Sequence, residues 1–176
     1  MKIGRPSSTE YDPAFERYVS RVPEHDALPA LERQAAEVRA VVGSLSAERA
    51  GYRYAPGKWS VRELVGHVTD SERVFGYRAL CVARGENAPL PGFEQEDYAA
   101  NAGHECYTLP DLVDEFETVR RANVSMLGHM DEKAILRIGR ANGLPISVRA
   151  LAFIMIGHVR HHLGVLAEKY GIGSAT

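Results

Sequence analysis

The chain has 176 residues, a length that suits one domain with a substantial core and is short for two. Hydrophobic residues make up 45% of it and charged residues 25%, which excludes the composition of a disordered protein. Its formal net charge of -2 offers no basic surface for a phosphate backbone. We therefore expect a single domain over residues 1–176, with its core at about 28–170, and no nucleic-acid partner.

The first residues, MKIGRPSSTE, lack the apolar core of a signal peptide. No stretch of the chain reaches the roughly 18 consecutive apolar residues that a membrane span needs. These features predict a cytoplasmic protein with no membrane partner. Cys81 and Cys106 could pair in principle, but a reducing compartment disfavours the bond, so we expect two free thiols.

Amphipathic segments separated by Gly- and Pro-bearing connections predict an all-α fold. A short leading helix is expected at residues 13–20 and a first long helix at about 28–45. The second long helix should cover about 60–84. Ser60 and Glu63 have the spacing of a capping box at its start.

Residues 86–107 are rich in Pro, Gly, Asn and acids, which predicts a long surface connection with a helical turn near 94–101. Thr108 should cap a third long helix that runs to about Met130. After a turn at Asn142 and Gly143, a fourth helix is expected from Ser147 to Tyr170. Four long helices predict a bundle.

The last helix carries His158 and His162, which are four residues apart and therefore point the same way from an otherwise apolar face. His67, beside the apolar face of the second long helix, is the natural third donor. Three imidazoles suit zinc, nickel, iron or cobalt and leave a position open for substrate. His161 is an additional candidate ligand or neighbouring group, whereas Arg160 should face solvent or a partner. The alternative is that these histidines are hydrogen-bonded in a metal-free core.

Other polar residues have weaker claims to the site. Glu63 and Asp70 lie within one turn of the second-helix histidine and could orient its imidazole, although solvated surface acids are the simpler interpretation. His104, Glu105 and Tyr107 could reach over the metal as a lid, but loop residues of these types are usually solvated.

Two segments resemble the DinB/YfiT-like superfamily. Residues 55–67 (APGKWSVRELVGH), followed by Ser-Glu-Arg at 71–73, resemble its Pro-Gly-Lys-Trp-Ser helix start and the His after it. Residues 157–164 (GHVRHHLG) resemble its second motif, and the similarity spans about 28–170. The resemblance implies an up-down-down-up four-helix bundle whose divalent metal is bound by residues that match His67, His158 and His162 here. Zinc or nickel is expected, with iron, cobalt or manganese as alternatives. Trp59 is interpreted as an aromatic plug at the bundle's end.

The resemblance also suggests a class of reaction. Relatives include transferases that use low-molecular-weight thiols such as bacillithiol, mycothiol or glutathione, thiol-dependent isomerases and metal-dependent hydrolases, and they are often homodimers. We therefore predict a homodimeric enzyme whose metal activates a thiol cosubstrate for attack on a small electrophilic substrate. The alternatives are a metal-dependent hydrolase and a non-catalytic, stress-associated metal-binding bundle. Because ligand histidines must be neutral, metal should be lost below about pH 6.

Overall fold

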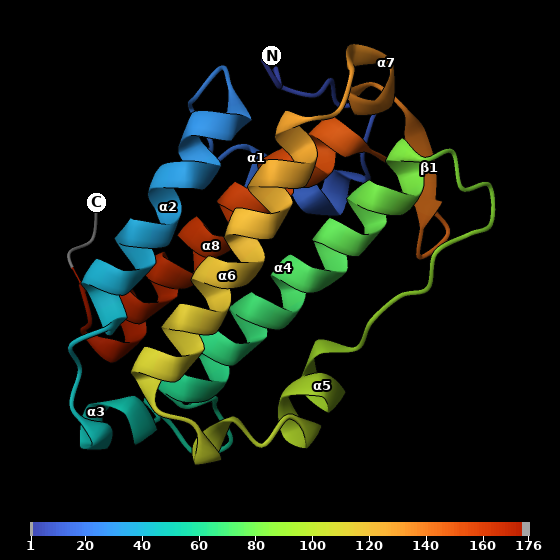
Figure 1. Cartoon of the computed structure of the whole chain (residues 1–176). Helices are drawn as coiled ribbons and strands as arrows, with labels where there is room; N and C mark the ends of the chain where they lie inside the picture. Colours follow the sequence, from blue (N-terminus) through green and yellow to red (C-terminus); the bar gives the residue numbers. More distant parts are fainter. Residues whose placement is uncertain (1, 174–176) are drawn as a thin grey trace.

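The computed structural model describes residues 2–173, which form a bundle of four long helices (Figure 1). These helices are α2 (Ala27–Val42), α4 (Val61–Ala83), α6 (Leu109–Gly128) and α8 (Val148–Tyr170). Both α2 and α4 pack against α6 and α8. In Figure 1, α4 and α6 run in one direction, whereas α2 and α8 run in the other. The predicted all-α class and up-down-down-up topology are confirmed.

Side-chain caps fix where the long helices begin. The Ser60 hydroxyl accepts a hydrogen bond from the Glu63 amide at 3.2 Å, and the Ser60 amide donates to the Glu63 carboxylate at 2.6 Å, which completes the predicted capping box. Thr108 caps α6 in the same way, and the Ser147 hydroxyl caps α8. The predicted starts of these helices are therefore correct. At its other end, α2 stops at Val42, three residues before the predicted end.

Shorter elements connect the bundle. The predicted leading helix and the helical turn in the long connection are both present, but the helices α3 and α7 were not predicted. In chain order, these elements are η1 (Pro13–Phe15), α1 (Glu16–Val19), α3 (Ala47–Gly51), α5 (Gln95–Asn101), η2 (His104–Cys106) and α7 (Glu132–Ile135).

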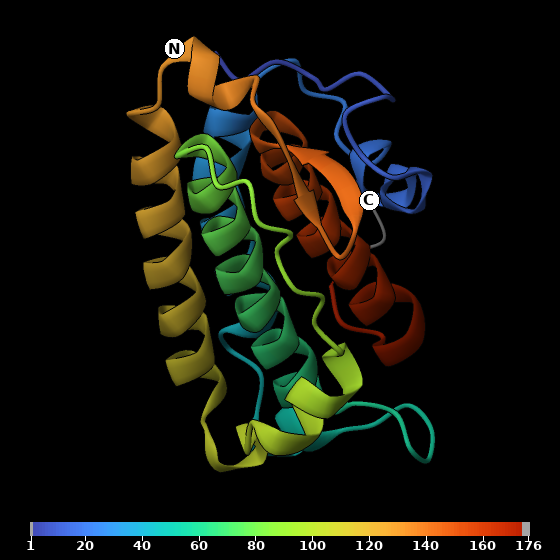
Figure 2. The ribbon, with the colours of Figure 1, turned by 90° about the vertical axis from the view of Figure 1, so that its right-hand side faces the viewer.

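The structure also contains an antiparallel hairpin of β1 (Ile138–Ala141) and β2 (Leu144–Ser147), which the sequence analysis did not predict. Its two-residue turn has positive φ at both Asn142 and Gly143, the conformation that Asn-Gly favours and that matches the twist of the strands. The Leu90 amide bonds to a β1 carbonyl at 3.0 Å, which ties the hairpin to the long connection. Figure 2 shows this connection passing alongside the hairpin on its way to α5.

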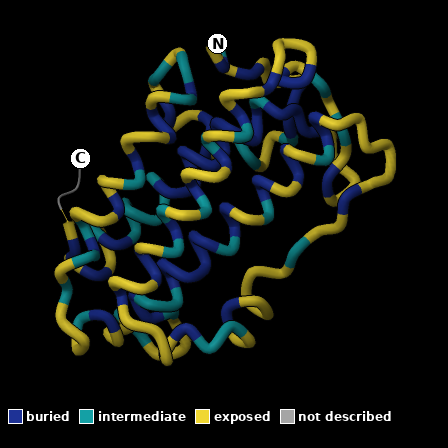
Figure 3. Tube along the Cα trace, viewed as in Figure 1, coloured by how far each residue is buried: buried dark blue, intermediate teal, exposed yellow. Residues whose placement is uncertain are grey.

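Helix α8 lies at the centre of the molecule. Residues 150–159 are all buried, and the helix packs against α1, α2 and α4. Figure 3 shows the buried positions, in dark blue, gathered toward the interior of the bundle. It is long and apolar enough to cross a membrane by composition alone, but 61% of its most apolar window is buried inside the fold. This apolarity is that of a core helix covered on several sides.

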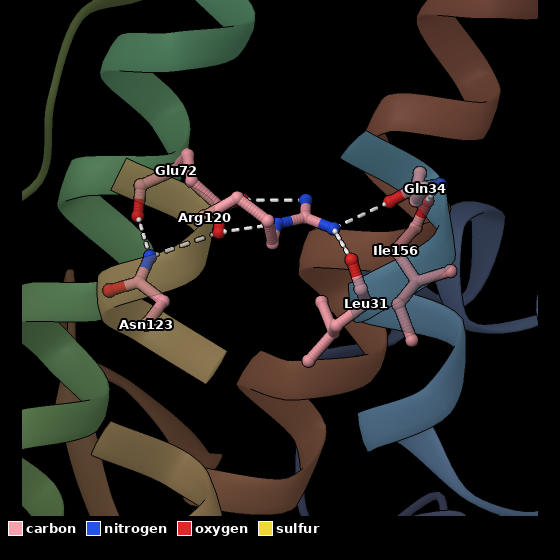
Figure 4. Close-up of polar contacts among 6 residues, drawn as sticks. All are labelled: Leu31, Gln34, Glu72, Arg120, Asn123 and Ile156. Atoms are coloured by element: carbon pink, nitrogen blue, oxygen red, sulfur yellow. Dashed lines mark hydrogen bonds and ion pairs between the residues drawn. The ribbon is translucent and has the colours of Figure 1, made fainter. Parts of the chain in front are cut away.

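A buried polar network joins the four helices (Figure 4). Arg120 of α6 donates from Nε and Nη2 to the two carboxylate oxygens of Glu72 in α4, each at 2.8 Å. Its Nη1 donates to Gln34 of α2 at 2.9 Å, and Gln34 in turn donates to the Ile156 carbonyl of α8 at 3.0 Å. Asn123 donates to the Glu72 carbonyl at 3.0 Å. The network pairs one buried charge with another across the core.

Candidate metal centre

Three histidines from two helices converge at one point in the bundle. His67 projects from α4, and His158 and His162 project from α8. The Nε2 atom of His158 lies 3.2 Å from that of His67 and 3.1 Å from that of His162. All three potential ligand atoms lie within 4.8 Å of one another. The structure thus brings together the three residues selected from the sequence.

Aromatic side chains pack around the histidine cluster, by which we mean His67, His158 and His162. The Trp59 ring lies 4.7 Å from that of His67, and the Tyr18 ring lies 5.3 Å from that of His158. Gly157 permits the second contact, since a Cβ atom at this position would lie 2.0 Å from the Tyr18 carbonyl oxygen. Close approach of α1 to α8 therefore depends on a glycine beside the cluster.

Burial keeps the cluster uncharged at neutral pH. It lowers the pKa of His67 to about 4, and the neighbouring His104 and His161 contribute in the same direction. Burial also holds the pKa of His158 and of His162 well below the ordinary value, with each further depressed by other histidines of the group. Neutral imidazoles keep the lone pairs that a metal ion requires, so the site needs no deprotonation before binding.

The spacing and the donor set fit a divalent transition metal. Nitrogen ligands about 2.0–2.1 Å from a tetrahedral ion lie roughly 3.3 Å from each other, close to the 3.1 and 3.2 Å observed around His158. Without an ion, the Nε2 atom of His158 faces two other Nε2 atoms, and a single ring nitrogen cannot donate to one while accepting from the other. The buried Nδ1 atom of His162 has no hydrogen-bond partner among the described residues.

The acids near His67 have other partners. The Glu63 carboxylate bonds to the Ser60 amide and forms an ion pair with Arg53 at 2.5 Å. Asp70 lies 3.4 Å from Arg73. Within residues 2–173 neither carboxylate hydrogen-bonds to the histidine cluster, so neither orients an imidazole.

The other histidines considered from the sequence lie outside the cluster. The ring of His161 packs edge-on against Tyr18, with centroids 5.7 Å apart. His104 is buried, and its Nε2 atom lies 4.0 Å from an Asp70 oxygen. Glu105 and Tyr107 are exposed. Of the three proposed lid residues, only His104 packs onto the bundle.

The prediction that Arg160 faces solvent or a partner is wrong. Its guanidinium is half-buried and donates to both carboxylate oxygens of Glu24, at 2.6 and 2.7 Å, and to the Arg21 carbonyl at 3.0 Å. These contacts attach the segment before α2 to α8. Arg160 therefore positions the chain around the bundle.

A cavity of about 170 Å³ reaches the cluster at His67 and His158. Its walls come from α1, α4, the long connection and the hairpin, and its lining includes Arg17 and Arg78 but no Asp or Glu. Neither this cavity nor the role of Arg78 in it was predicted from the sequence. The sequence places Arg78 on the same face of the helix as His67. The wall that encloses the cavity, however, comes partly from the hairpin, which was not predicted.

Fold and site define a four-helix-bundle protein with a buried three-histidine centre, compatible with a metal and open to a cavity. Residues 30–166 match the family model of the DinB superfamily. The chain belongs to this superfamily, as its two motifs indicated.

Two known proteins are similar over most of the chain. A protein from Oceanobacillus iheyensis named "Putative metal-dependent hydrolase OB0413" is 26% identical over 141 residues, which are 79% of this chain and 80% of that protein. The solved structure of YfiT from Bacillus subtilis, described as "a probable metal-dependent hydrolase with an unusual four-helix bundle topology", matches with a TM-score of 0.74. It is 15% identical, and the match covers 81% of this chain and 82% of YfiT. This second similarity supports the fold.

Proposed function

We propose that this protein is a metal-dependent enzyme in which His67, His158 and His162 hold one divalent cation. The convergence of three neutral imidazoles beside a cavity carries the proposal. The names of the two similar proteins, which refer to metal-dependent hydrolysis, support it. Zinc and nickel are the ions that we expect first, because an imidazole-only site suits both.

The residues that line the cavity indicate which nucleophile, a thiol or water, the site favours. A divalent ion at the cluster supplies a Lewis acid that lowers the pKa of a thiol or of water. Hydrolytic zinc sites often add a carboxylate as general base, as in the H-E-x-x-H motif. No carboxylate of residues 2–173 lines this cavity. The nucleophile must therefore lose its proton without a base from the chain, which favours a thiol, whose own pKa is already closer to neutrality.

A transferase that uses a low-molecular-weight thiol and a small electrophile is thus the first candidate. The chain's contribution is to hold three neutral imidazoles in place, to exclude bulk water and to bind the electrophile beside them. A metal-dependent hydrolase is the second candidate, and the names of the similar proteins favour it. A non-catalytic metal-binding bundle is the third, and it would require a fourth protein ligand that closes the site against substrate.

Metal content is the direct test of the site. Protein purified without an affinity tag should contain nearly one divalent ion per chain by elemental analysis. His158→Ala should lose it, because His158 lies closest to both other donors. His161→Ala is the matched control and should keep its metal, since His161 is adjacent in sequence but lies outside the cluster. Failure of the wild type to bind metal even after reconstitution would leave the histidines as a hydrogen-bonded core.

Cobalt-substituted protein can distinguish a thiol transferase from a hydrolase. Addition of a thiol should change the visible spectrum, and turnover of an electrophile should require that thiol. Turnover without any thiol would instead identify the hydrolase. Homodimer formation and a cytoplasmic location stay predictions, and light scattering of the purified protein tests the first.

A further inference from the structure

Four side chains of α4 form a stripe that leads away from the histidine cluster. His67, Ser71, Phe75 and Arg78 all line the cavity of about 170 Å³. Their spacing of four, four and three residues places them on one face of the helix. Arg78 lies about 16 Å further along the helix axis than His67. The stripe therefore joins the candidate metal centre to a positive charge at some distance from it.

Arg78 is a buried cation without a counterion among the residues that the structure describes. Its residue is 7% exposed, and its one hydrogen bond within the described chain runs from Nη2 to the Pro91 carbonyl at 2.8 Å. No carboxylate of residues 2–173 lies within ion-pair distance of it. Burial lowers the pKa of the Arg78 guanidinium for lack of such a partner. Removing a charge from water is unfavourable unless it is paired, so an unpaired buried Arg indicates an anion that is bound in use.

Other groups in the cavity support binding of an anion. Arg17 is a second cation in the lining, and no acidic residue accompanies it. The Ser71 hydroxyl is buried and has no hydrogen-bond partner among the described residues, which leaves a donor free for a ligand oxygen. The cavity therefore combines two positive charges with a spare hydroxyl.

The adjacent cavity on the other side of α4 shows a different pattern. It has a volume of about 530 Å³ and includes His104 in its lining. Three acids, Asp70, Asp97 and Glu115, face it together with Arg73. That arginine is paired with Glu115 at 2.5 Å. The arginine of this cavity is thus paired with acids, whereas the two arginines of the other cavity form no ion pair within residues 2–173.

Most of the remaining cavity wall is apolar, and its other polar residues, Gln95 and Asn142, are exposed. Phe75 and Phe93 contribute aromatic rings, and the rings of Phe75 and Tyr18 both pack edge-on against the cluster residue His158, with centroids 5.6 and 5.3 Å away. An apolar cavity of about 150 Å³ holds one benzene ring, so a volume of about 170 Å³ suits a single ring or a short aliphatic stem. Arg17 is exposed and its guanidinium stacks on the Tyr18 ring, 4.7 Å from its centroid, so Arg78 and Ser71 are the buried donors. A multiply charged phosphate would need more buried donors than these two, whereas a planar carboxylate matches a guanidinium fork.

We propose that the cavity binds an organic carboxylate on a short apolar stem, with the carboxylate paired to Arg78 and the stem directed along α4 toward the histidine cluster. This assignment of a substrate class rests on the proposed function for what happens at the histidines. Binding of the anion itself needs no metal, so the two ideas can fail separately.

The test compares 3-phenylpropanoate with its neutral amide, 3-phenylpropanamide, by isothermal titration calorimetry. Both ligands are titrated into the protein as purified and after treatment with a chelator. The carboxylate should bind at least about tenfold more tightly than the amide, because a charge-assisted pair with a buried guanidinium is worth that much. Arg78→Gln should remove this preference, and Arg78→Lys should restore part of it.

Arg84→Gln is the matched control. It removes the same charge at the end of the same helix, where the side chain is exposed and does not line the cavity, and it should leave both affinities unchanged. Equal affinity of the wild type for acid and amide would overturn the inference, with or without metal. Carboxylate binding that requires metal but survives Arg78→Gln would also overturn it, while leaving the metal centre in place. If Arg78→Gln does not fold, the affinities of the wild type and of Arg78→Lys for the acid and the amide still test the inference.

Discussion

Two buried polar regions of this bundle each include a residue of α4, Glu72 in one and His67 in the other, and they differ in how completely their groups are paired. In the Arg120 network, the guanidinium of Arg120 bonds to both oxygens of Glu72 and to Gln34, and Asn123 completes the set. In the histidine cluster, three ring nitrogens face each other, and the second nitrogen of His162 has no partner among the described residues.

The contrast separates groups that hold the fold from groups that await a ligand. A buried polar group without a partner destabilises the fold, so native structures rarely retain one unless it has another use. Within the network, the charges of Arg120 and Glu72 pair with each other at 2.8 Å. Along the cavity that leads away from the cluster, Arg78 has no counterion within residues 2–173, and the Ser71 hydroxyl has no hydrogen-bond partner there. A buried polar group that is paired within the chain thus has a structural role. An unpaired group along the cavity is available to bind a ligand.

The largest effect should come from breaking the network. Arg120→Met leaves the Glu72 carboxylate buried without its partner, which should lower the free energy of unfolding by about 3–5 kcal/mol. Urea denaturation of the two proteins measures the difference. The added replacement Glu72→Leu should recover part of the loss, because it removes the unpaired charge.

Arg39→Gln is the control for this experiment. Arg39 pairs with Glu117 on the surface, where solvent screens the interaction, and its replacement should change stability little. If Arg120→Met proves as mild as Arg39→Gln, the buried network does not hold the helices together. Pairing within the chain would then not distinguish structural groups from ligand-binding groups.

A second, smaller effect should appear as a pH dependence of the metal-free protein. Burial lowers the pKa of His67 to about 4, whereas its unfolded value is 6.5. Between these values the unfolded chain binds the proton and the folded chain does not, so stability falls as pH drops from about 6.5 to about 4. His67 alone accounts for about 3 kcal/mol over this window. The predicted loss of metal below pH 6 should therefore shift to lower pH.

Denaturation of chelator-treated protein at several pH values measures this slope. His67→Asn should make the slope shallower between pH 4 and 6.5. His129→Gln, which replaces an exposed histidine at the end of α6, should leave it unchanged. Equal slopes in the wild type and His67→Asn would show that the cluster is not kept neutral by the fold.

Much of the bundle could be predicted because its signals are local. Ser60, Thr108 and Ser147 mark three helix starts through contacts within one turn, and all three are correct. The pair His158 and His162 needs only helical periodicity to be placed on one face. His67 was chosen as the third donor from its place beside the apolar face of the second long helix, the motif resemblance agreed, and the structure brings the three together.

The rest depends on contacts between distant segments. Asn142 and Gly143 were recognised as a turn, but the strands beside them have only four residues each, too few for alternation to stand out. The pairing of Arg160 with Glu24 joins residues 136 positions apart. The cavity at Arg78 likewise requires α4, the long connection and the hairpin together. No local pattern encodes these contacts.

The smallest expected effect concerns one side chain of the cavity, the Ser71 hydroxyl. Ser71→Ala removes a buried group that has no partner in the described structure, and Ala favours a helix more than Ser does, so the free energy of unfolding should stay the same or rise by about 0.5 kcal/mol. Affinity for 3-phenylpropanoate should nevertheless fall a few-fold. Urea denaturation and calorimetry of the same preparations measure both quantities.

Thr69→Val is the matched change on the same helix. The Thr69 hydroxyl is also buried, but it donates to the Val65 carbonyl at 3.1 Å, and its loss should lower stability by about 1 kcal/mol without changing affinity. A loss of stability in Ser71→Ala comparable to that in Thr69→Val would mean that Ser71 has a partner in the folded protein. Ser71 would then belong with Arg120 among the groups that hold the bundle, and the cavity would keep only its arginines for an anion.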